Sequence, residues 1–246
     1  MPNIQFGSGV LIGKTMGTVP GTPVQFGTLQ EVSLSFESSM KELHGQYQFP
    51  IAIGRGVSKV SGNAKFADIN ALVLGELYFN ETPVTGQTIL ALNEAGTIPA
   101  VSTYIIQVTN HATFVDDYGV LNTTTGLPFT KMTTAVASGQ YQVDATTGTY
   151  TFVAADEGVK VLISYTYTTT GGQTITMNNQ LLGVAPVFQV ILHRNFNNKI
   201  FQVTLYNAVS TKLTVPTKLE DFTIGEFDFG AFVNSAGILG KMSFPE

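Results

Sequence analysis

The sequence contains no cysteine among its 246 residues, which excludes disulfide bonds and thiolate metal sites. Charged residues make up only 12%, and the net charge of −5 gives a poor basis for holding nucleic acid by phosphate neutralisation. Apolar runs of transmembrane length are also lacking. The first residues, MPNIQFGSGVLIGKT, have no basic region before an apolar core and so do not form a signal peptide. We expect a protein that is made and used without crossing a membrane.

Catalytic motifs are scarce as well. The segment GVLIGKT, residues 9–15, comes nearest to a phosphate loop, but a P-loop needs its first glycine where Ser8 stands. No H-x-x-x-H or H-x-H pair suggests a metal site, because the three histidines are scattered: His44, His111 and His193. No G-x-S-x-G elbow is present, and Asp116–Asp117 lack a calcium-loop pattern. We therefore expect neither an enzyme nor a bound cofactor or metal.

What the sequence does contain is the alternation of β-strands, within a composition that is 43% hydrophobic. Residues 29–36 alternate strictly, as in an antiparallel strand with one polar face. Residues 46–53 form a second extended run, in which Pro50 indicates an edge or a break. The residues after each run, 38–43 and 54–56, are expected to be turns.

One amphipathic helix is predicted, directly after a strand at residues 57–66. The helix is expected over residues 68–79, with Asp68 as its N-cap and Asn80 at its exit. Its apolar residues follow the i, i+3, i+4, i+8 spacing of a single face: Ile69, Leu72, Val73 and Leu77. Because an isolated helix of about three turns is marginal in water, we expect Leu72, Val73 and Leu77 to pack on a sheet.

The two ends of the chain differ in composition and in their expected secondary structure. Residues 1–27 are rich in glycine and proline, and we expect a loop or extended arm outside the core, ordered by a neighbouring subunit. Near the C-terminus, residues 186–193 should pair with residues 200–206 across Asn197–Asn198, which suit a turn with positive φ. Gly225 is predicted to be a β-bulge that resets the register.

Residues 96–171 are dense in Thr, Val, Tyr and Gly, with short strand patterns separated by turn signals. These features predict a β-rich insertion of meander or small-sandwich type. The expected domain organisation is therefore a core with an N-terminal arm, made of residues 1–95 and 172–246, and an insertion at 96–171.

In the order of these features, the chain resembles the major tail tube proteins of bacteriophages with long, non-contractile tails. The strand at 29–36 is followed by Lys-Glu-Leu-His-Gly at 41–45, which is similar to the family's K-x-L-x-G turn. The strand at 57–66 leads straight into the helix, and EFDFGAF at 226–232 resembles the family's closing strand. The segment 139–167 resembles stretches of phage tail and virion proteins.

The resemblance implies a mainly β fold of the tail-tube type, a β-sandwich or barrel with one packed α-helix and a β-rich insertion. It implies a structural virion protein, made in the host cytoplasm, whose hexameric rings stack into a tube through which DNA is ejected. The implied partners are other copies of the chain, the tape measure protein, the tail terminator and distal tail proteins. Genomic DNA passes only in transit, and no membrane is involved.

On this hypothesis the polar faces of the core strands line the channel. The candidate channel-facing acids are Glu31, Glu37, Glu226 and Asp228, with Lys59 and Lys65 as their possible partners. The insertion is expected on the outer surface, or on the shoulder where rings stack. Two alternatives stay open: a tail decoration or receptor-binding β module of a virion, and an enzyme on a β scaffold.

Overall fold

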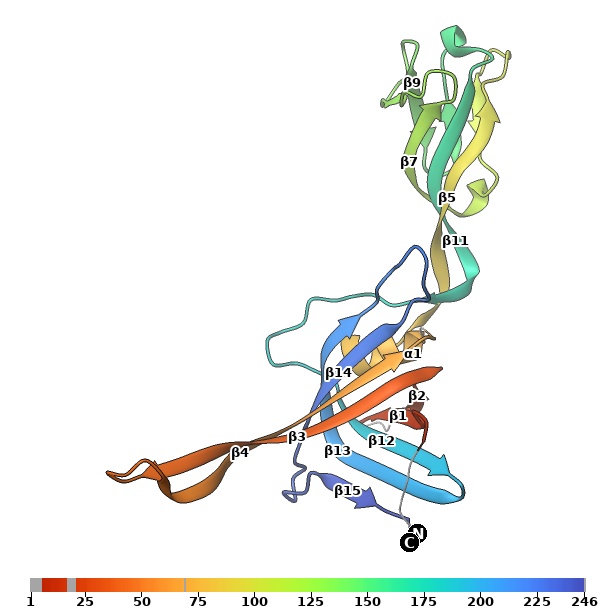
Figure 1. Ribbon diagram of the computed structural model, residues 1–246. Helices are drawn as coiled ribbons and strands as arrows, with labels where there is room; N and C mark the ends of the chain where they lie inside the picture. The colour runs from red at the N-terminus through yellow and green to blue at the C-terminus, as the bar shows by residue number, and fades with distance from the viewer. Residues whose placement is uncertain (1–5, 17–20, 69, 246) are drawn as a thin grey trace. The chain divides into compact units, whose positions relative to one another are not determined.

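The computed structural model describes residues 6–16, 21–68 and 70–245, and it is mainly β, with 56% strand and 6% helix. The chain divides into two compact units, which Figure 1 colours along the sequence. Unit 1 comprises residues 1–83 and 175–246, and unit 2 comprises Val84–Thr174. Unit 2 is longer than the insertion expected at 96–171, because the ladder between its first and last strands runs from Lys160 with Thr97 to Thr174 with Val84, with two irregularities in register.

Unit 1 is built on one eight-stranded sheet with antiparallel pairings. The strand order is β2-β1-β12-β13-β14-β4-β3, and β15 pairs with the free part of β13. The strand bounds are β1 Val10–Thr15, β2 Val24–Gln25, β3 Leu29–His44, β4 Pro50–Phe66, β12 Val187–Phe196, β13 Lys199–Thr214, β14 Gly225–Phe232 and β15 Gly240–Ser243.

The expectation of an arm outside the core is wrong for much of the N-terminal segment. Strand β1 pairs residue for residue with β12, and β2 pairs with β1. Leu11, Val24 and Phe26 are buried in the core of unit 1. The short apolar runs that contain these residues are flanked by glycine and proline. The glycine and proline content favoured a loop and gave no sign of the buried strands. Residues 1–5 and 17–20 lie outside the described part of the chain.

The turns expected at 38–43 and 54–56 are also absent from the described chain, since β3 and β4 form one long hairpin. Their ladder runs from Leu29 opposite Phe66 to His44 opposite Pro50, with three irregularities in register. The glycines that suggested a turn, at positions 54 and 56, lie within β4. Pro50 begins β4, at the end of the hairpin where no ladder bond is needed from its missing N–H.

The predicted helix is present but shorter, and it begins later. It consists of α1 (Ala71–Leu74) followed by a π-helical turn, η1 (Gly75–Phe79). The N-cap is Asn70 rather than Asp68, because the Asn70 side-chain oxygen accepts a hydrogen bond from the Leu72 N–H at 2.9 Å. Asn80 ends the helical segment in the left-handed conformation, with φ of 56°. Ile69 lies outside the described residues.

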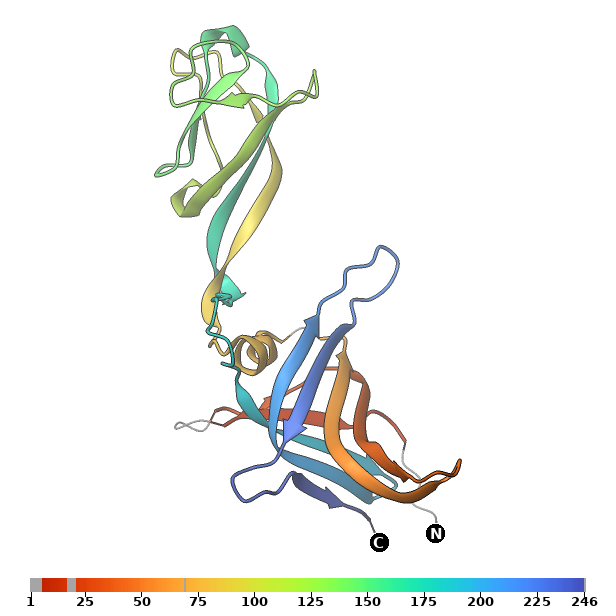
Figure 2. The same ribbon diagram turned by 90° about the vertical axis from the view of Figure 1, so that its left-hand side faces the viewer.

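The helical segment covers the sheet of unit 1 (Figure 2). Val73 and Leu77 are buried in the core, and Leu72 packs against it while half-buried. Leu77 lies over Gly13 of β1, so closely that a β-carbon at position 13 would come within 2.5 Å of the Leu77 Cδ1. Phenylalanine rings fill the rest of this core, among them Phe66, Phe188, Phe227 and Phe229.

The C-terminal strands agree with one prediction and correct another. Strands β12 and β13 pair across Asn197 and Asn198, whose φ angles are 51° and 61°, so the predicted turn is confirmed. Gly225 is not a bulge: it is the first residue of β14, in register with Phe66. The alternation that suggested the bulge came from Phe222, which precedes the strand and is exposed.

Unit 2 has its own core between two small sheets. One sheet has the order β5-β11-β7, and the other has the order β6-β10-β9-β8. Their bounds are β5 Val84–Thr97, β6 Ile105–Gln107, β7 Phe114–Asn122, β8 Thr130–Lys131, β9 Gln140–Asp144, β10 Thr149–Thr151 and β11 Lys160–Thr174, with 3₁₀ turns η2 at His111–Thr113 and η3 at Ala154–Asp156. In the described chain, no helix is long and apolar enough to span a membrane.

Candidate functional site

The polar face of the unit 1 sheet gathers most of the channel-facing candidates into neighbouring positions. Glu31 of β3 and Glu226 of β14 both lie opposite Lys65 of β4. The Lys65 Nζ donates to the Glu31 Oε2 at 2.7 Å, and the Lys212 Nζ of β13 donates to the Glu226 Oε2 at 3.2 Å. A row of alternating charge therefore crosses four adjacent strands, in the order acid, base, acid, base.

The next positions on this face hold the other two candidates. Asp228 accepts a hydrogen bond from the Asn63 side-chain amide at 2.5 Å and lies opposite Lys212. Glu37 lies opposite Lys59, just before the register irregularity between Ser38 and Met40. An open groove of about 420 Å³ lies along this face, and its polar lining includes Ser33, Ser35, Ser61, Asn63, Lys59 and Asp228.

The local charge of this face is close to balanced. The positions just described carry four acids and three lysines, the third being Lys212, which gives them a net charge of −1. Hydrogen bonding to Glu31, and the charge of that carboxylate, raise the pKa of Lys65 above its ordinary value. The acids of this face therefore stand in rows with lysines rather than as isolated negative charges. Sequence reasoning missed Lys212, since nothing in the local pattern places β13 beside β14.

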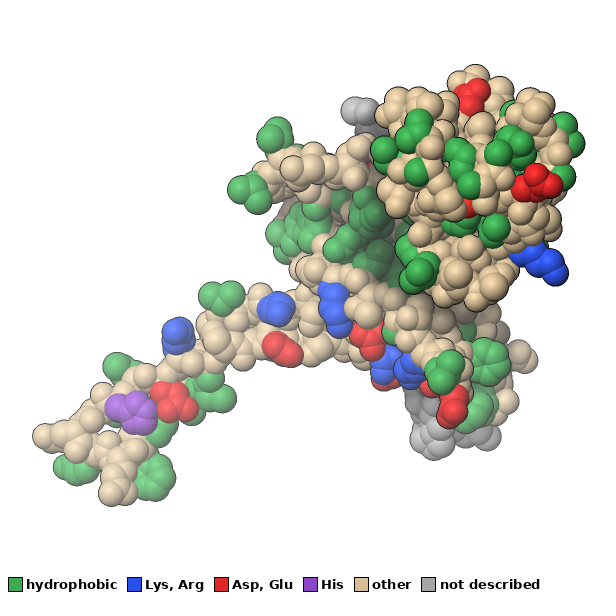
Figure 3. All heavy atoms as spheres, turned by 90° about the horizontal axis from the view of Figure 1, so that it is seen from above, with side chains coloured by type: hydrophobic (Ala, Val, Ile, Leu, Met, Phe, Trp, Pro, Cys, Tyr) green, Lys and Arg blue, Asp and Glu red, His purple; other side chains and the backbone are tan. Residues whose placement is uncertain are grey.

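A second surface is the outer part of the β3–β4 hairpin, residues 37–57, which we call the hairpin arm. Figure 3 shows it with hydrophobic side chains between charged ones. Its large apolar side chains are mostly exposed to solvent, with Phe49 at 82% and Ile53 at 60%. The exposed set is Met40, Leu43, Tyr47, Phe49, Ile51, Ile53 and Val57.

Met40 and Ile53 of the hairpin arm continue the core face of the sheet, whereas Leu43 lies on the opposite face. Val32 and Phe36 of β3 face the core, and even-numbered positions keep that side as far as Met40. Strand β4 takes up the irregularity, because two steps from Ser38 to Met40 match three steps along β4. Within the described residues nothing covers this face, and β3 pairs with β4 alone.

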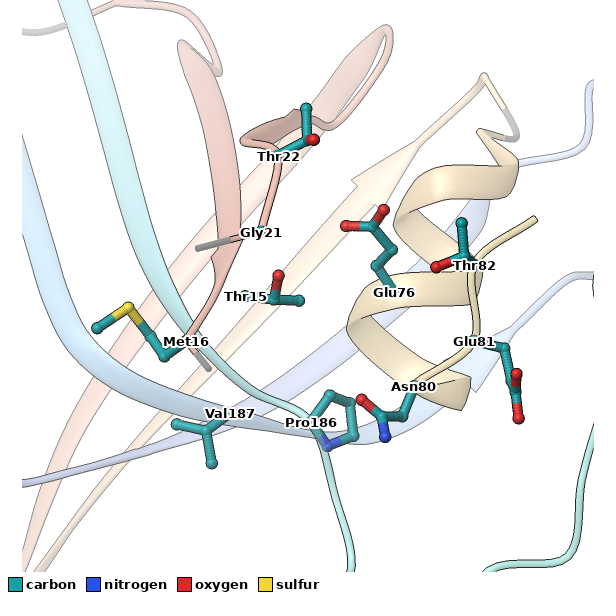
Figure 4. A pocket seen from close by; sticks show the side chains of 10 residues that line it. All are labelled: Thr15, Met16, Gly21, Thr22, Glu76, Asn80, Glu81, Thr82, Pro186 and Val187. Atoms are coloured by element: carbon teal, nitrogen blue, oxygen red, sulfur yellow. The ribbon is translucent and has the colours of Figure 1, made fainter. Parts of the chain in front are cut away.

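Another hollow of unit 1 lies between the end of β1 and the end of the helical segment (Figure 4). It holds about 390 Å³, and its charged lining residues are Glu76 and Glu81. Glu81 is engaged by Asn178, whose side-chain amide donates to it at 2.6 Å. Threonine hydroxyls line the hollow beside these two carboxylates, from Thr15, Thr22 and Thr82. Among the described residues, no cluster of three or more His, Asp or Glu could hold a metal ion.

Unit 2 contains a buried polar cluster around Asp117, whose side chain is only 2% exposed. Its carboxylate accepts hydrogen bonds from the hydroxyls of Tyr141 at 2.8 Å and Tyr150 at 2.9 Å, and it pairs with the Lys131 Nζ at 3.0 Å. Burial raises the pKa of both tyrosines, and Asp117 raises it further. Because every donor meets an acceptor, this cluster is a structural feature of the unit 2 core.

A second buried acid of unit 2, Asp156, binds the Ser138 hydroxyl at 2.6 Å and the Gly139 N–H. Asp117 and Asp156 are therefore interior groups that contribute little to the surface charge of unit 2.

No protein-family model matches the sequence, and no curated protein matches it either.

Proposed function

We propose that the protein is a structural subunit that assembles with copies of itself into the stacked rings of a phage tail tube. The observation that carries the proposal is the hairpin arm. A two-stranded hairpin is marginally stable in water unless its apolar face is covered. Here that face continues the core of the sheet, from Phe36 to Met40 and Ile53, into open solvent. Exposed apolar patches of this kind mark protein contact sites.

The open edge of β3 supports self-association in a second way. A sixteen-residue strand that pairs on one side offers a row of unsatisfied N–H and C=O groups. No proline interrupts residues 29–44. Among the described residues outside β4, only Ser8 and Arg194 bond to the first carbonyls of this strand, at Leu29 and Val32. A second copy can extend the sheet along the remaining part. Repeated around an axis, such head-to-tail contacts close into a ring.

The charge-paired face of the sheet suits the wall of a channel that DNA traverses. Its rows hold acids beside lysines, so a passing phosphate meets neither a continuous positive surface to bind nor unscreened acids alone. In the proposed tube this face turns to the lumen and unit 2 stands on the outer side, or on the shoulder between rings. The implied partners are the same as those of tail tube proteins: further copies, the tape measure, the terminator and the distal tail proteins.

Electron microscopy and sedimentation of the purified protein over a range of concentrations test the proposal. We expect rings or tubes from the unaltered chain. The variant Tyr47→Ser/Phe49→Ser/Ile51→Ser should stay monomeric with an unchanged melting temperature, because these side chains are already exposed. A matched control, Leu127→Ser/Val136→Ser in unit 2, should assemble normally. Discrete monomers or trimers of the unaltered chain at every concentration would contradict the tube and favour a decoration or receptor-binding module.

A further inference from the structure

Strands β5 and β11 continue beyond the sandwich of unit 2 as a two-stranded ribbon (Figure 1). The third strand of their sheet, β7, begins where Phe114 lies opposite Tyr167. The residues between that position and the two ends of unit 2 are 84–88 and 168–174, and we call them the neck. A ribbon of two strands is marginally stable in water unless an apolar face is packed. The stability of the neck therefore depends on what its own side chains bury.

The neck has no packed face. The structure describes every residue of both segments, and each is exposed or half-exposed. Val161, Ile163 and Tyr165, further along β11, are by contrast buried in the core of unit 2. The large apolar side chain of the neck, Val84, is 66% exposed. Opening the neck therefore costs little more than its backbone hydrogen bonds, which water replaces.

The ladder of the neck is interrupted in its middle. Its register shifts between Thr169 and Gln173, so that Gly86 of β5 faces the three residues 170–172 of β11. Gly86 and Gly172 both have positive φ, 102° and 77°, a conformation that residues with a side chain rarely adopt. A β-bulge bends its strand and disrupts the ladder locally. The position where Gly86 meets this bulge is thus the weakest part of the ribbon.

The chain is held on both sides of the neck. In unit 1, the Asn178 side-chain amide donates to the Glu81 carboxylate at 2.6 Å, and the Gln180 amide donates to the Phe79 carbonyl at 2.8 Å. These bonds join the segment that leads into β5 to the segment that follows β11. In unit 2, β7 pairs with β11 from Tyr167 onward. Bending is therefore confined to the residues between these two fixed points.

We propose that the neck is a hinge, centred on Gly86 and the bulge at 170–172, about which unit 2 turns relative to unit 1. Hinges are short segments that absorb changes in φ and ψ while the parts on either side keep their structure. The hinge belongs to a single copy, so the inference does not depend on self-assembly. It gives unit 2 a range of orientations, in which its surface reaches a partner without rearrangement of unit 1.

Distances between spin labels test the hinge, because the cysteine-free chain accepts labels at chosen sites. Ser235→Cys in unit 1 and Ala145→Cys in unit 2 place one label on an exposed turn of each unit. Pulsed electron paramagnetic resonance of a dilute sample, with an excess of unlabelled chain, reports distances within single copies. Two control pairs lie inside one unit: Ser235→Cys with Asn195→Cys, and Ala145→Cys with Leu127→Cys. We expect a distance distribution several times wider across the neck than in either control.

A shortened neck tests where the chain bends. Deleting Thr170 and Gly171 removes the two extra residues and leaves Gly172 opposite Gly86 in a regular ladder. Adding Gly86→Thr/Gly172→Thr places strand-forming residues at both positions. This variant should narrow the distribution across the neck severalfold. The matched control, Thr168→Ser/Thr170→Ser, keeps the length of the neck and its bulge, so its distribution should stay as wide as that of the unaltered chain.

Hydrogen exchange gives a second measurement that needs no substitution. The amides of residues 168–174 should exchange much faster than those of residues 161–167, although both stretches belong to β11. Equal protection along the strand would overturn the hinge, and so would a distribution across the neck as narrow as the controls. A shortened chain with the same width as the unaltered chain would overturn the placement of the hinge at the bulge.

Discussion

Lys65 and Glu31 form a cross-strand ion pair, with 2.7 Å between Nζ and Oε2, on the polar face of the unit 1 sheet. The neighbouring strand repeats the arrangement in the pair of Lys212 with Glu226. Exposed pairs of this kind add little to folding stability. Their consequence is electrostatic: they set how strongly the face attracts or repels a polyanion.

The first prediction changes that balance. Glu31→Gln/Glu226→Gln/Asp228→Asn leaves one acid, Glu37, beside three lysines, which turns the local net charge from −1 to +2. We expect measurable binding of duplex DNA at low salt that weakens steeply as salt rises. Fluorescence anisotropy of labelled DNA measures it. The control Asp116→Asn/Glu157→Gln/Glu220→Gln removes the same charge from exposed positions elsewhere, and equal DNA binding by both variants would contradict a special role for this face.

These residues illustrate what the sequence predicts and what it does not. Alternation placed Glu31 and Glu37 on the polar side of a strand, and the same logic put Glu226 and Asp228 together. Alternation says nothing of which strands are neighbours, because strand order depends on contacts far apart in the chain. Lys212, fourteen residues before its partner Glu226, therefore escaped prediction.

Turns and helix caps were likewise predicted correctly where the local sequence decides them, and wrongly where pairing with a distant strand or a neighbouring residue decides them. The Asn197–Asn198 turn was predicted correctly because positive φ favours asparagine at both positions. The hairpin arm was not predicted, since Gly54 and Gly56 favour turns by themselves. The ladder with β3, in which Gly54 lies opposite Lys41, keeps this part of β4 extended. The Asp68 cap failed for a similar reason: Asn70, two residues later, offers the same chemistry at the position where the helix begins.

The second prediction concerns the packing of the helical segment. Leu77→Ala should lower the free energy of unfolding by about 2–5 kcal/mol, because it empties a fully buried site. Gly13→Ala should cost about 1–3 kcal/mol by pressing a methyl group against the Leu77 Cδ1. Together the two changes should cost less than their sum, since the new methyl enters the space that leucine left. Urea unfolding of the three variants measures this, and strict additivity would show that Leu77 does not hold position 13.

The third prediction follows from the burial of the N-terminal strands. Deleting residues 1–27 removes Leu11, Val24 and Phe26, each worth about 1.5–3 kcal/mol of burial, and leaves the edge of β12 unpaired. We expect unit 1 of the truncated chain to unfold, as measured by hydrogen exchange. The control Phe6→Ser changes an exposed side chain in the same segment and should exchange like the unaltered protein. A truncated chain with normal protection in β12 would show that these strands are dispensable.

The last prediction concerns the tyrosines of unit 2. Burial, first of all, and the Asp117 carboxylate hold the pKa of Tyr150 above its ordinary value. A raised folded-state pKa contributes stability that is complete below the unfolded pKa of about 10 and is lost as pH rises above it. Unit 2 should therefore lose stability at alkaline pH.

Tyr150→Phe separates this effect from general alkaline unfolding. It removes one donor from a buried carboxylate and should cost about 2 kcal/mol at pH 7. Above pH 10 the variant should lose less further stability than the unaltered protein, because one titrating group is gone. Hydrogen exchange of strands β10 and β11 between pH 7 and 11, referred to the intrinsic exchange rate at each pH, follows unit 2 alone. Tyr118→Phe is the control: its hydroxyl belongs to an exposed side chain, so both its stability and its pH dependence should match the unaltered protein. A Tyr150→Phe variant as stable as the Tyr118→Phe control at pH 7 would show that the Asp117 cluster does not support this core.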